Sequence, residues 1–262
     1  MHCIRADRSG DWKIANLYVL ADLHIGDPYS DTRMIARRVE EISADPFGVV
    51  ILNGDILNTA LRNSVSDVYA EVLSPMKQIE AACTLLSPIS KQIIGATTGN
   101  HEARAYREDG IDMTRLIARQ LGFEDCYAPE GVLVFLRFGH VAMHGRHKDR
   151  PEKQLYTIYA THGTGGGKKE GAKAINLADL AGIVDADIYI RSHTHQPMHF
   201  TQGFYRTSPG NSSAAIIERH FVSTGAAMDY GGYSQSKEFK PSSKSTPIIR
   251  LDAREKRAVV SL

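Results

Sequence analysis

Five short clusters of aspartate, asparagine, glutamate and histidine, each placed directly after a predicted β-strand, restrict the fold more than any other feature of this sequence. The runs before them are apolar and β-branched, as is typical of buried strands. Open α/β sheets bind ligands at the carboxyl ends of their strands, so all five clusters can converge on one site. The runs are Ile14–Leu20, Gly48–Leu52, Gln92–Thr97, Tyr156–Ala160 and Ile188–Ile190, and the clusters are Asp22 with His24, Asp55, Asn100 with His101 and Glu102, His162, and His193 with His195.

The side chains in these clusters are of the kind that binds divalent metal ions. Asp22 and His24 are two residues apart, as are His193 and His195, and alternate residues of an extended segment point to the same side. The atoms that could bind a metal ion are carboxylate or amide oxygens and imidazole nitrogens, and the clusters contain no cysteine thiolate. This set suits manganese, iron, zinc and related ions, and it disfavours a structural zinc bound by cysteines.

The number of candidate ligands indicates two metal ions, because a single tetrahedral ion cannot use all of them. Two divalent ions would outweigh the charge of two aspartates and a bridging hydroxide. The remaining positive charge would attract a phosphate anion and stabilise an in-line transition state. The candidates are Asp22, His24, Asp55, Asn100, His162, His193 and His195.

The rest of the chain predicts an α/β fold in a single domain over residues 1–262. Strands and helices alternate in the first two thirds, which is typical of layered sheets with helices outside. The last part, 198–262, is β-rich, and a long, flexible and exposed loop is expected at 224–246. Pro75 is expected to kink or divide the second helix. Further strands are predicted at Val132–Phe138, His199–Thr207, Ala214–Ser223, Pro247–Leu251 and Ala258–Leu262, and helices after Asp31, from about Ser66 to Leu86, over Asp112–Gln120 and over Gly171–Ile183.

Composition excludes several classes of protein. The 31 Lys and Arg residues nearly balance the 30 Asp and Glu residues, so the net charge of +1 argues neither for nor against nucleic-acid binding. No apolar run is long enough to cross a membrane. The three cysteines form no CxxC pair, and the N-terminal residues carry charges instead of an apolar signal segment. We therefore expect a cytoplasmic protein with reduced thiols, and a homo-oligomer stays open.

In their order, the five clusters resemble the motifs of the calcineurin-like metallophosphoesterase superfamily: D-x-H, G-D, G-N-H-[D/E], a lone histidine and G-H-x-H. The resemblance spans about residues 14–200, with one departure at Ser192, where the family usually has glycine. It implies a four-layer α-β-β-α sandwich in which two mixed sheets are flanked by helices. It also implies a hydrolase of phosphoesters with two divalent metal ions, Mn²⁺ in the first place and Fe, Zn, Ni or Mg as alternatives.

The same resemblance implies a role for each residue of the clusters. Asp55 would bridge the two metal ions. His101 would protonate the leaving oxygen or stabilise charge on the phosphoryl group, and Glu102 would orient the His101 imidazole. The first ion would be bound by Asp22, His24 and His195, and the second by Asn100, His162 and His193.

The identity of the lone histidine is open in the sequence. His144 also follows an apolar strand and precedes a glycine, so it competes with His162 for this place. We favour His162, because the Gly-Thr-Gly-Gly-Gly segment after it allows the backbone to approach a phosphate. Lys168 and Lys169 follow that segment and add positive charge.

The substrate class is open as well. The Asp-Leu-His-Ile-Gly opening is similar to that of the DNA-repair nuclease branch of the superfamily, and the chain lacks the arginine that phosphoprotein phosphatases carry just after the Gly-Asp block. Arg146, Lys168 and Lys169 are candidate contacts to a nucleic-acid backbone. We predict a phosphodiesterase that acts on DNA, RNA or a nucleotide. The alternatives are a phosphomonoesterase and a non-catalytic scaffold of the same fold.

Overall fold

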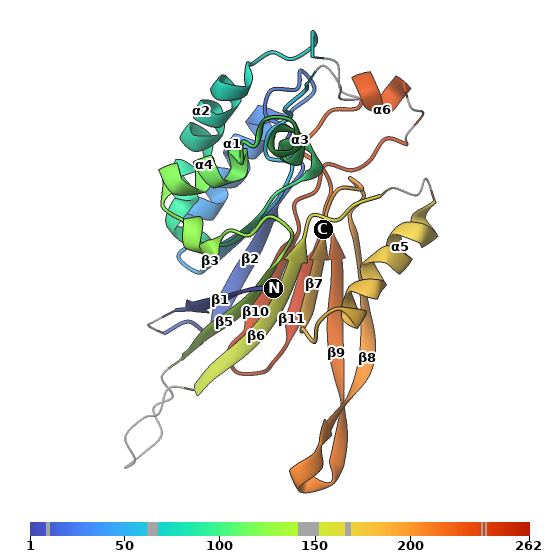
Figure 1. The fold of residues 1–262 in the computed structure, drawn as a ribbon. Helices are drawn as coiled ribbons and strands as arrows, with labels where there is room; N and C mark the ends of the chain where they lie inside the picture. Colours follow the sequence, from blue (N-terminus) through green and yellow to red (C-terminus); the bar gives the residue numbers. More distant parts are fainter. Residues whose placement is uncertain (9–10, 62–67, 141–151, 166–168, 237, 239) are drawn as a thin grey trace.

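The computed structural model describes residues 1–8, 11–61, 68–140, 152–165, 169–236, 238 and 240–262. Two mixed β-sheets pack face to face, and helices cover their outer faces (Figure 1). The predicted sandwich of two mixed sheets flanked by helices is confirmed. In the described part of the chain, every helix is too short or too polar to cross a membrane.

The first sheet has five strands in the order β11-β10-β2-β3-β4. β2, β3 and β4 run parallel, with Leu17 beside Val49 in the register of the first pair. All six residues of β3 are buried, because helices cover one face of this strand and the second sheet covers the other. The bounds are β2 Ile14–Leu20, β3 Gly48–Asn53, β4 Ile93–Thr97, β10 Ile248–Asp252 and β11 Ala258–Ser261.

The second sheet has six strands in the order β1-β5-β6-β7-β9-β8. β6 and β7 are parallel neighbours, so they end at the same edge. β8 and β9 form a long hairpin that extends beyond the rest of the molecule (Figure 1). β1 is not among the strands predicted from the sequence, because charged residues such as Arg5 and Asp7 alternate with its buried ones. The bounds are β1 His2–Asp7, β5 Val132–His140, β6 Glu152–Thr161, β7 Ile188–Arg191, β8 Met198–Ser208 and β9 Ser213–Ser223.

Helices α1 to α4 lie on the five-stranded sheet, and α5 lies on the six-stranded sheet (Figure 1). α1 begins after Asp31, whose side chain accepts a hydrogen bond from the Met34 amide at 3.0 Å. The α-helices are α1 Thr32–Ala44, α2 Pro75–Leu86, α3 Asn100–Asp109, α4 Met113–Leu121, α5 Glu170–Ala178 and α6 Gly232–Ser236. The 3₁₀ helices are η1 Ser87–Gln92, η2 Glu124–Cys126, η3 Asp179–Gly182 and η4 Pro209–Asn211.

The apolar core has its largest parts on the two sides of the five-stranded sheet. Between the sheets, side chains such as Leu17, Val49 and Ile158 are fully buried. On the outer side, Ile35 and Ile42 of α1 pack onto the same sheet. This packing holds β2, β3, β4, β6 and β7 in place, so the loops at their carboxyl ends start from rigid positions.

Pro75 does not kink a longer helix. It is the first residue of α2, where its missing N–H group costs nothing, because the first N–H groups of a helix have no partner within it. Val72, which falls within the helix predicted from about Ser66 to Leu86, lies before α2 and is 62% exposed. Met76 is 63% exposed, so the buried face of α2 begins later, at Gln78 and Ile79.

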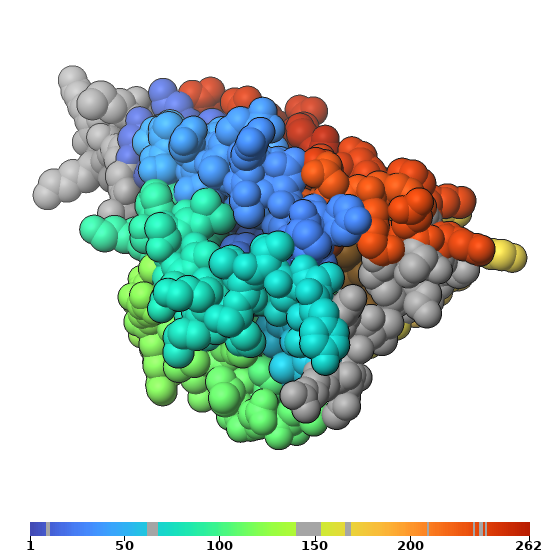
Figure 2. Space-filling model, turned by 90° about the horizontal axis from the view of Figure 1, so that it is seen from above, coloured from blue at the N-terminus to red at the C-terminus, as the bar shows by residue number. Residues whose placement is uncertain are grey.

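The segment 224–246, expected as an exposed loop, is buried at both ends, where Thr224 and Thr246 are almost inaccessible. In Figure 2 this segment, drawn in orange-red, lies beside the blue segment that follows β2. The amide of Asp229 donates a hydrogen bond to the Tyr29 carbonyl at 2.8 Å, which ties the two segments together.

Candidate metal centre

The loops after β2, β3, β4, β6 and β7 meet at one end of the sandwich and bring the five sequence clusters together. Among the described residues, three groups of potential ligands have atoms that all lie within 4.8 Å of one another. His24 and Asp55 each belong to two of these groups, so the groups are continuous. The groups are Asp22, His24 and His195; His24, Asp55 and His101; and Asp55, His162 and His193.

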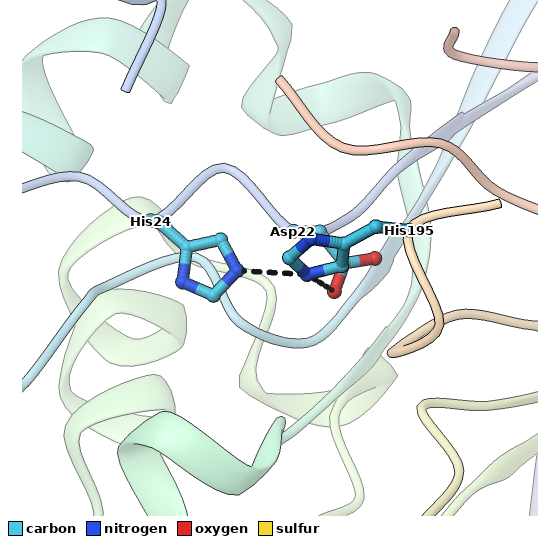
Figure 3. Close-up of side chains that lie close together, drawn as sticks. All are labelled: Asp22, His24 and His195. Carbon is cyan, nitrogen blue, oxygen red and sulfur yellow. Dashed lines mark hydrogen bonds and ion pairs between the residues drawn. The ribbon is translucent and has the colours of Figure 1, made fainter. Parts of the chain in front are cut away.

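Asp22, His24 and His195 form the first group (Figure 3). The Nε2 atoms of the two imidazoles lie 3.2 Å apart, and His195 Nε2 is also 3.2 Å from Asp22 Oδ1. Asp22 Oδ1 is buried, and its contact with His195 Nε2 is an ion pair only when that imidazole is protonated; otherwise this oxygen has no hydrogen-bond partner among the described residues. A buried carboxylate oxygen without a partner is costly, and a divalent cation between the carboxylate and the two imidazoles would satisfy it. These residues therefore fit a divalent metal ion.

Asp55, Asn100, His162 and His193 lie on the other side of the centre. His162 Nε2 is 3.2 Å from Asp55 Oδ2 and 3.3 Å from Asn100 Oδ1. The same Asp55 Oδ2 is 3.9 Å from His24 Nε2 of the first group. One carboxylate oxygen thus faces imidazoles of both groups, which is the position that a ligand shared by two cations would need.

Five of the candidate ligands have a positive backbone φ, in the left-handed region that aspartate and histidine tolerate better than most residues. Each of them lies within four residues of the end of a strand, so the sharp turns redirect the chain where the sheet ends. Hydrogen bonds between neighbouring turns hold this conformation; for example, Asp22 N donates to Gly54 O at 3.0 Å. The φ angles are 51° for Asp22, 47° for His24, 50° for Asp55, 71° for His193 and 53° for His195.

The turns after β3 and β4 pack backbone against backbone, which requires glycine in both. A Cβ atom on Gly54, whose φ is +79°, would lie 2.6 Å from Gly99 N, and one on Gly99 would collide with the Asp55 carboxylate. This close approach lets His101 N donate to Asp55 Oδ1 at 2.8 Å. The Gly-Asp and Gly-Asn-His-Glu motifs are in contact for this reason.

Asn53 and Thr224, which the sequence analysis does not assign to the site, hold ligands in place. Asn53 O accepts a hydrogen bond from His162 Nδ1 at 2.7 Å, so Nε2 of this ring is left to face the centre. Asn53 Nδ2 donates to Ser192 Oγ at 2.7 Å, and Ser192 has no positive φ, so serine is tolerated where the family usually has glycine. Thr224 Oγ1 donates to Asp22 Oδ2 at 3.2 Å. The sequence signal for Asn53 is a polar residue at the end of a fully apolar strand.

Glu102 does not orient the His101 ring, contrary to the sequence prediction. It is the third residue of α3, a position from which a glutamate side chain turns back to the backbone at the start of the helix. The hydrogen-bond partner of His101 Nδ1 is the Asn58 carbonyl oxygen, at 2.6 Å. The Glu102 carboxylate accepts three backbone hydrogen bonds, from the N–H groups of Leu57 at 2.8 Å, Gly99 at 3.0 Å and Asp55 at 3.2 Å.

The buried carboxylates control the protonation of the nearby imidazoles. Burial alone would lower the pKa of His162, but the carboxylates of Asp55 and Asp22 raise it to about 10. Asp22 likewise raises the pKa of His195 against the effect of burial. Burial, followed by the neighbouring His101, lowers the pKa of His24. Without a metal ion, His162 therefore holds a proton at neutral pH, and a cation that binds there would take the place of that proton.

The residues predicted to contact the substrate are only partly described. Lys169 is exposed directly before α5. Arg146 and Lys168 lie outside the described residues, and so does His144, the alternative to His162. His162 itself lies beside Asp55 and Asn100, where the lone histidine of the family pattern is expected.

Comparison with known proteins gives the family. The family model for the calcineurin-like phosphoesterases matches residues 15–197, whereas no curated protein sequence matches significantly. Among solved structures, a conserved protein from Streptococcus pneumoniae TIGR4, described as a predicted phosphoesterase, is 13% identical, with 95% of this chain and 98% of that chain covered and a TM-score of 0.36. Vps29 complexed with zinc, from Entamoeba histolytica, is 12% identical, with 94% and 97% covered and a TM-score of 0.39. The family match includes all five clusters, and this chain accordingly belongs to the calcineurin-like phosphoesterase family, as a hydrolase that acts on ester bonds.

Proposed function

We propose that this protein hydrolyses phosphodiesters in nucleic acids or nucleotides with the help of two divalent metal ions, Mn²⁺ in the first place. The position of Asp55 supports two ions more than any other observation, because one of its oxygens lies 3.2 Å from His162 Nε2 and 3.9 Å from His24 Nε2. The first ion would be held by Asp22, His24 and His195, the second by Asn100, His162 and His193, and Asp55 would serve both.

In this proposal the metal ions, when bound, supply positive charge for the phosphoryl oxygens and activate a water molecule. His101 is the residue that moves a proton. Its Nε2 is 3.9 Å from Asp55 Oδ2, so the ring borders the centre, while its Nδ1 is held by Asn58 O. From this position His101 can give a proton to the leaving oxygen.

A diester is favoured over a monoester by the turn that follows Asp55. A monoester dianion carries more negative charge than a diester, and an additional cation beside the centre would favour it. The turn after Asp55 presents Asn58, Thr59 and Ala60 instead, all of them buried and none of them cationic. Lys169, exposed at the start of α5, supports a further contact to the phosphate backbone of a longer substrate.

A substrate panel tests the proposal. The purified protein, loaded in turn with Mn²⁺, Fe²⁺, Zn²⁺, Ni²⁺ or Mg²⁺, would be assayed with bis-p-nitrophenyl phosphate, p-nitrophenyl phosphate, single-stranded DNA and double-stranded DNA. We expect hydrolysis of the diester and of DNA, with much slower hydrolysis of the monoester. Faster turnover of the monoester would support a phosphomonoesterase. Metal binding without hydrolysis of any substrate would support a scaffold.

A further inference from the structure

The turn that holds His101 has an unfavourable backbone conformation. Thr59 has a φ of +47° and is fully buried. A β-branched residue rarely adopts this conformation, because its Cβ substituents crowd the backbone. The residue before it, Asn58, presents its carbonyl oxygen to His101 Nδ1 at 2.6 Å. The direction of this carbonyl therefore depends on a turn that would not keep its shape without support.

Two side chains from the α2 region support this turn. Gln78 Oε1 accepts a hydrogen bond from Thr59 N at 3.0 Å. Glu71 Oε1 accepts from Asn58 Nδ2 at 3.0 Å and from Ala60 N at 2.7 Å. The two supporting side chains are themselves connected, because Gln78 Nε2 donates to Glu71 Oε2 at 2.8 Å. Every residue of the turn is thus hydrogen-bonded to Gln78 or Glu71.

The packing of α2 does not require a glutamine at position 78. Gln78 is completely buried next to Ile79, on the face of the helix that packs into the apolar core. Its amide is fully used: Nε2 also donates to Leu73 O at 2.9 Å. The side chain lies so close to Gly26 that a Cβ atom there would be 2.4 Å from Gln78 Nε2. These hydrogen bonds offset the cost of burying the amide of Gln78.

We propose that Gln78 and Glu71 are positioning residues for His101. They hold the Asn58–Thr59 turn so that Asn58 O accepts from His101 Nδ1. Nε2 of the protonated ring then faces the reacting phosphate and gives its proton to the leaving oxygen, and the neutral ring that remains carries its proton on Nδ1. This inference rests on the proposed function, in which His101 supplies the proton for the leaving oxygen. The side-chain hydrogen bonds of Gln78 and Glu71 go to Asn58, Thr59, Ala60, Leu73 and each other and not to a candidate metal ligand, so we expect metal binding to be retained when either residue is replaced.

The test compares Gln78→Met with Gln92→Met. Methionine has a similar size but cannot accept the hydrogen bond from Thr59 N. Gln92 is a matched control, because its side chain also makes hydrogen bonds to a loop: Nε2 donates to Ile42 O at 2.8 Å and to Asp45 O at 3.1 Å. Gln92 lies at the opposite end of the five-stranded sheet, away from the centre. If Gln78→Met does not fold, Glu71→Gln is tested as the milder variant. It replaces Glu71 Oε2, which accepts from Gln78 Nε2, by an NH₂ group that can only donate, so this hydrogen bond is lost.

We expect Gln78→Met to lower kcat about 10- to 100-fold on a diester with a poor leaving group, the loss typical of a misplaced catalytic group. KM and the number of bound metal ions should not change, and Gln92→Met should keep the kcat of the wild type. In the His101→Ala background, Gln78→Met should have no further effect on kcat. An equal loss in the two backgrounds would overturn the inference, because it would mean that Gln78 acts independently of His101.

A second measurement does not depend on activity. In the zinc-loaded protein, the ring ¹⁵N signals of His101, assigned by their absence in His101→Ala, should show an Nδ1–H tautomer in the wild type. Gln78→Met should give a mixture of tautomers, and Gln92→Met should not. Unchanged signals in Gln78→Met would overturn the inference. An altered tautomer in a protein that hydrolyses no phosphoester would instead contradict the proposed function and leave the positioning role supported.

Discussion

His162 Nε2 lies 3.2 Å from Asp55 Oδ2, although the two residues follow strands of different sheets. His162 comes directly after β6 of the six-stranded sheet, and Asp55 comes after β3 of the five-stranded sheet. Each side of the candidate centre therefore contains residues from both sheets, since His195 from the six-stranded sheet also faces Asp22 from the other. The centre exists only when the two sheets are packed together.

Replacement of Asp55 by asparagine tests the shared ligand. Asp55→Asn should abolish turnover and lower the metal content, because both cations would lose an anionic ligand. Metal analysis by mass spectrometry and the diester assay would be made on the same sample. A variant that keeps two metal ions per chain and near-native activity would remove Asp55 from the centre.

His101→Ala should separate catalysis from metal binding. We expect both metal ions to remain bound and kcat to fall roughly 10²–10⁴-fold, the range for the loss of one general acid or base. The loss should be smaller for 4-nitrophenyl esters than for esters of simple alcohols, because a good leaving group needs less protonation. If the metal content falls together with the rate, His101 is a ligand and the assignment of its role is wrong.

Glu102→Ala should destabilise the protein more than His101→Ala does. The substitution leaves the buried N–H groups of Leu57, Gly99 and Asp55 without an acceptor, and each such loss costs about 1–3 kcal/mol. The free energy of unfolding, measured by urea titration, should fall by on the order of 3 kcal/mol or more. Glu102→Gln keeps one acceptor oxygen and should lose less. Wild-type stability in Glu102→Ala would contradict this role.

Metal binding and stability should respond to pH in opposite directions. The pKa of His162 is raised from 6.5 to about 10, so its protonated form stabilises the metal-free fold below pH 6.5, and this stabilisation is lost as the pH rises towards 10. A cation must displace that proton, so its affinity should increase over the same range, with proton release on binding. Calorimetry with Zn²⁺ in buffers of different ionisation enthalpy would count the protons. His162→Asn should release fewer protons, and equal release would show that another group carries them.

Salt dependence tests the contact to nucleic acid. Lys148 lies two residues after Arg146 and belongs to the same basic stretch. If Arg146, Lys148, Lys168 and Lys169 neutralise phosphates of single-stranded DNA, log K should fall with log[salt] with a slope of roughly 0.7 per contact. Alanine at all four positions should flatten the slope and reduce cleavage of DNA but not of bis-p-nitrophenyl phosphate. Alanine at the exposed Lys91 and Arg254 is the matched control. Equal losses on both substrates would mean that these residues act on the reacting phosphate or on the fold.

The strands and candidate ligands were largely predictable, because both leave local patterns. The predicted run Ile14–Leu20 coincides with β2, and the cluster residues that follow each strand are recognisable by type. The partners of those residues were not predictable. Asn53 and Asn58 act through backbone carbonyl oxygens, which every residue has, and Glu102 bonds to backbone N–H groups of another turn. Such contacts leave no mark in residue type or spacing.

The sequence by itself determined which residues end each strand and which donor atoms they offer, because strand formation and side-chain chemistry depend on neighbouring residues. Only the tertiary structure decided which donors meet. Asp55 faces His162 because the apolar faces of the two sheets pack together, and His101 bonds to Asn58 because glycines at 54 and 99 let two turns approach. These distances depend on burial and packing between segments far apart in the chain, to which no local pattern responds.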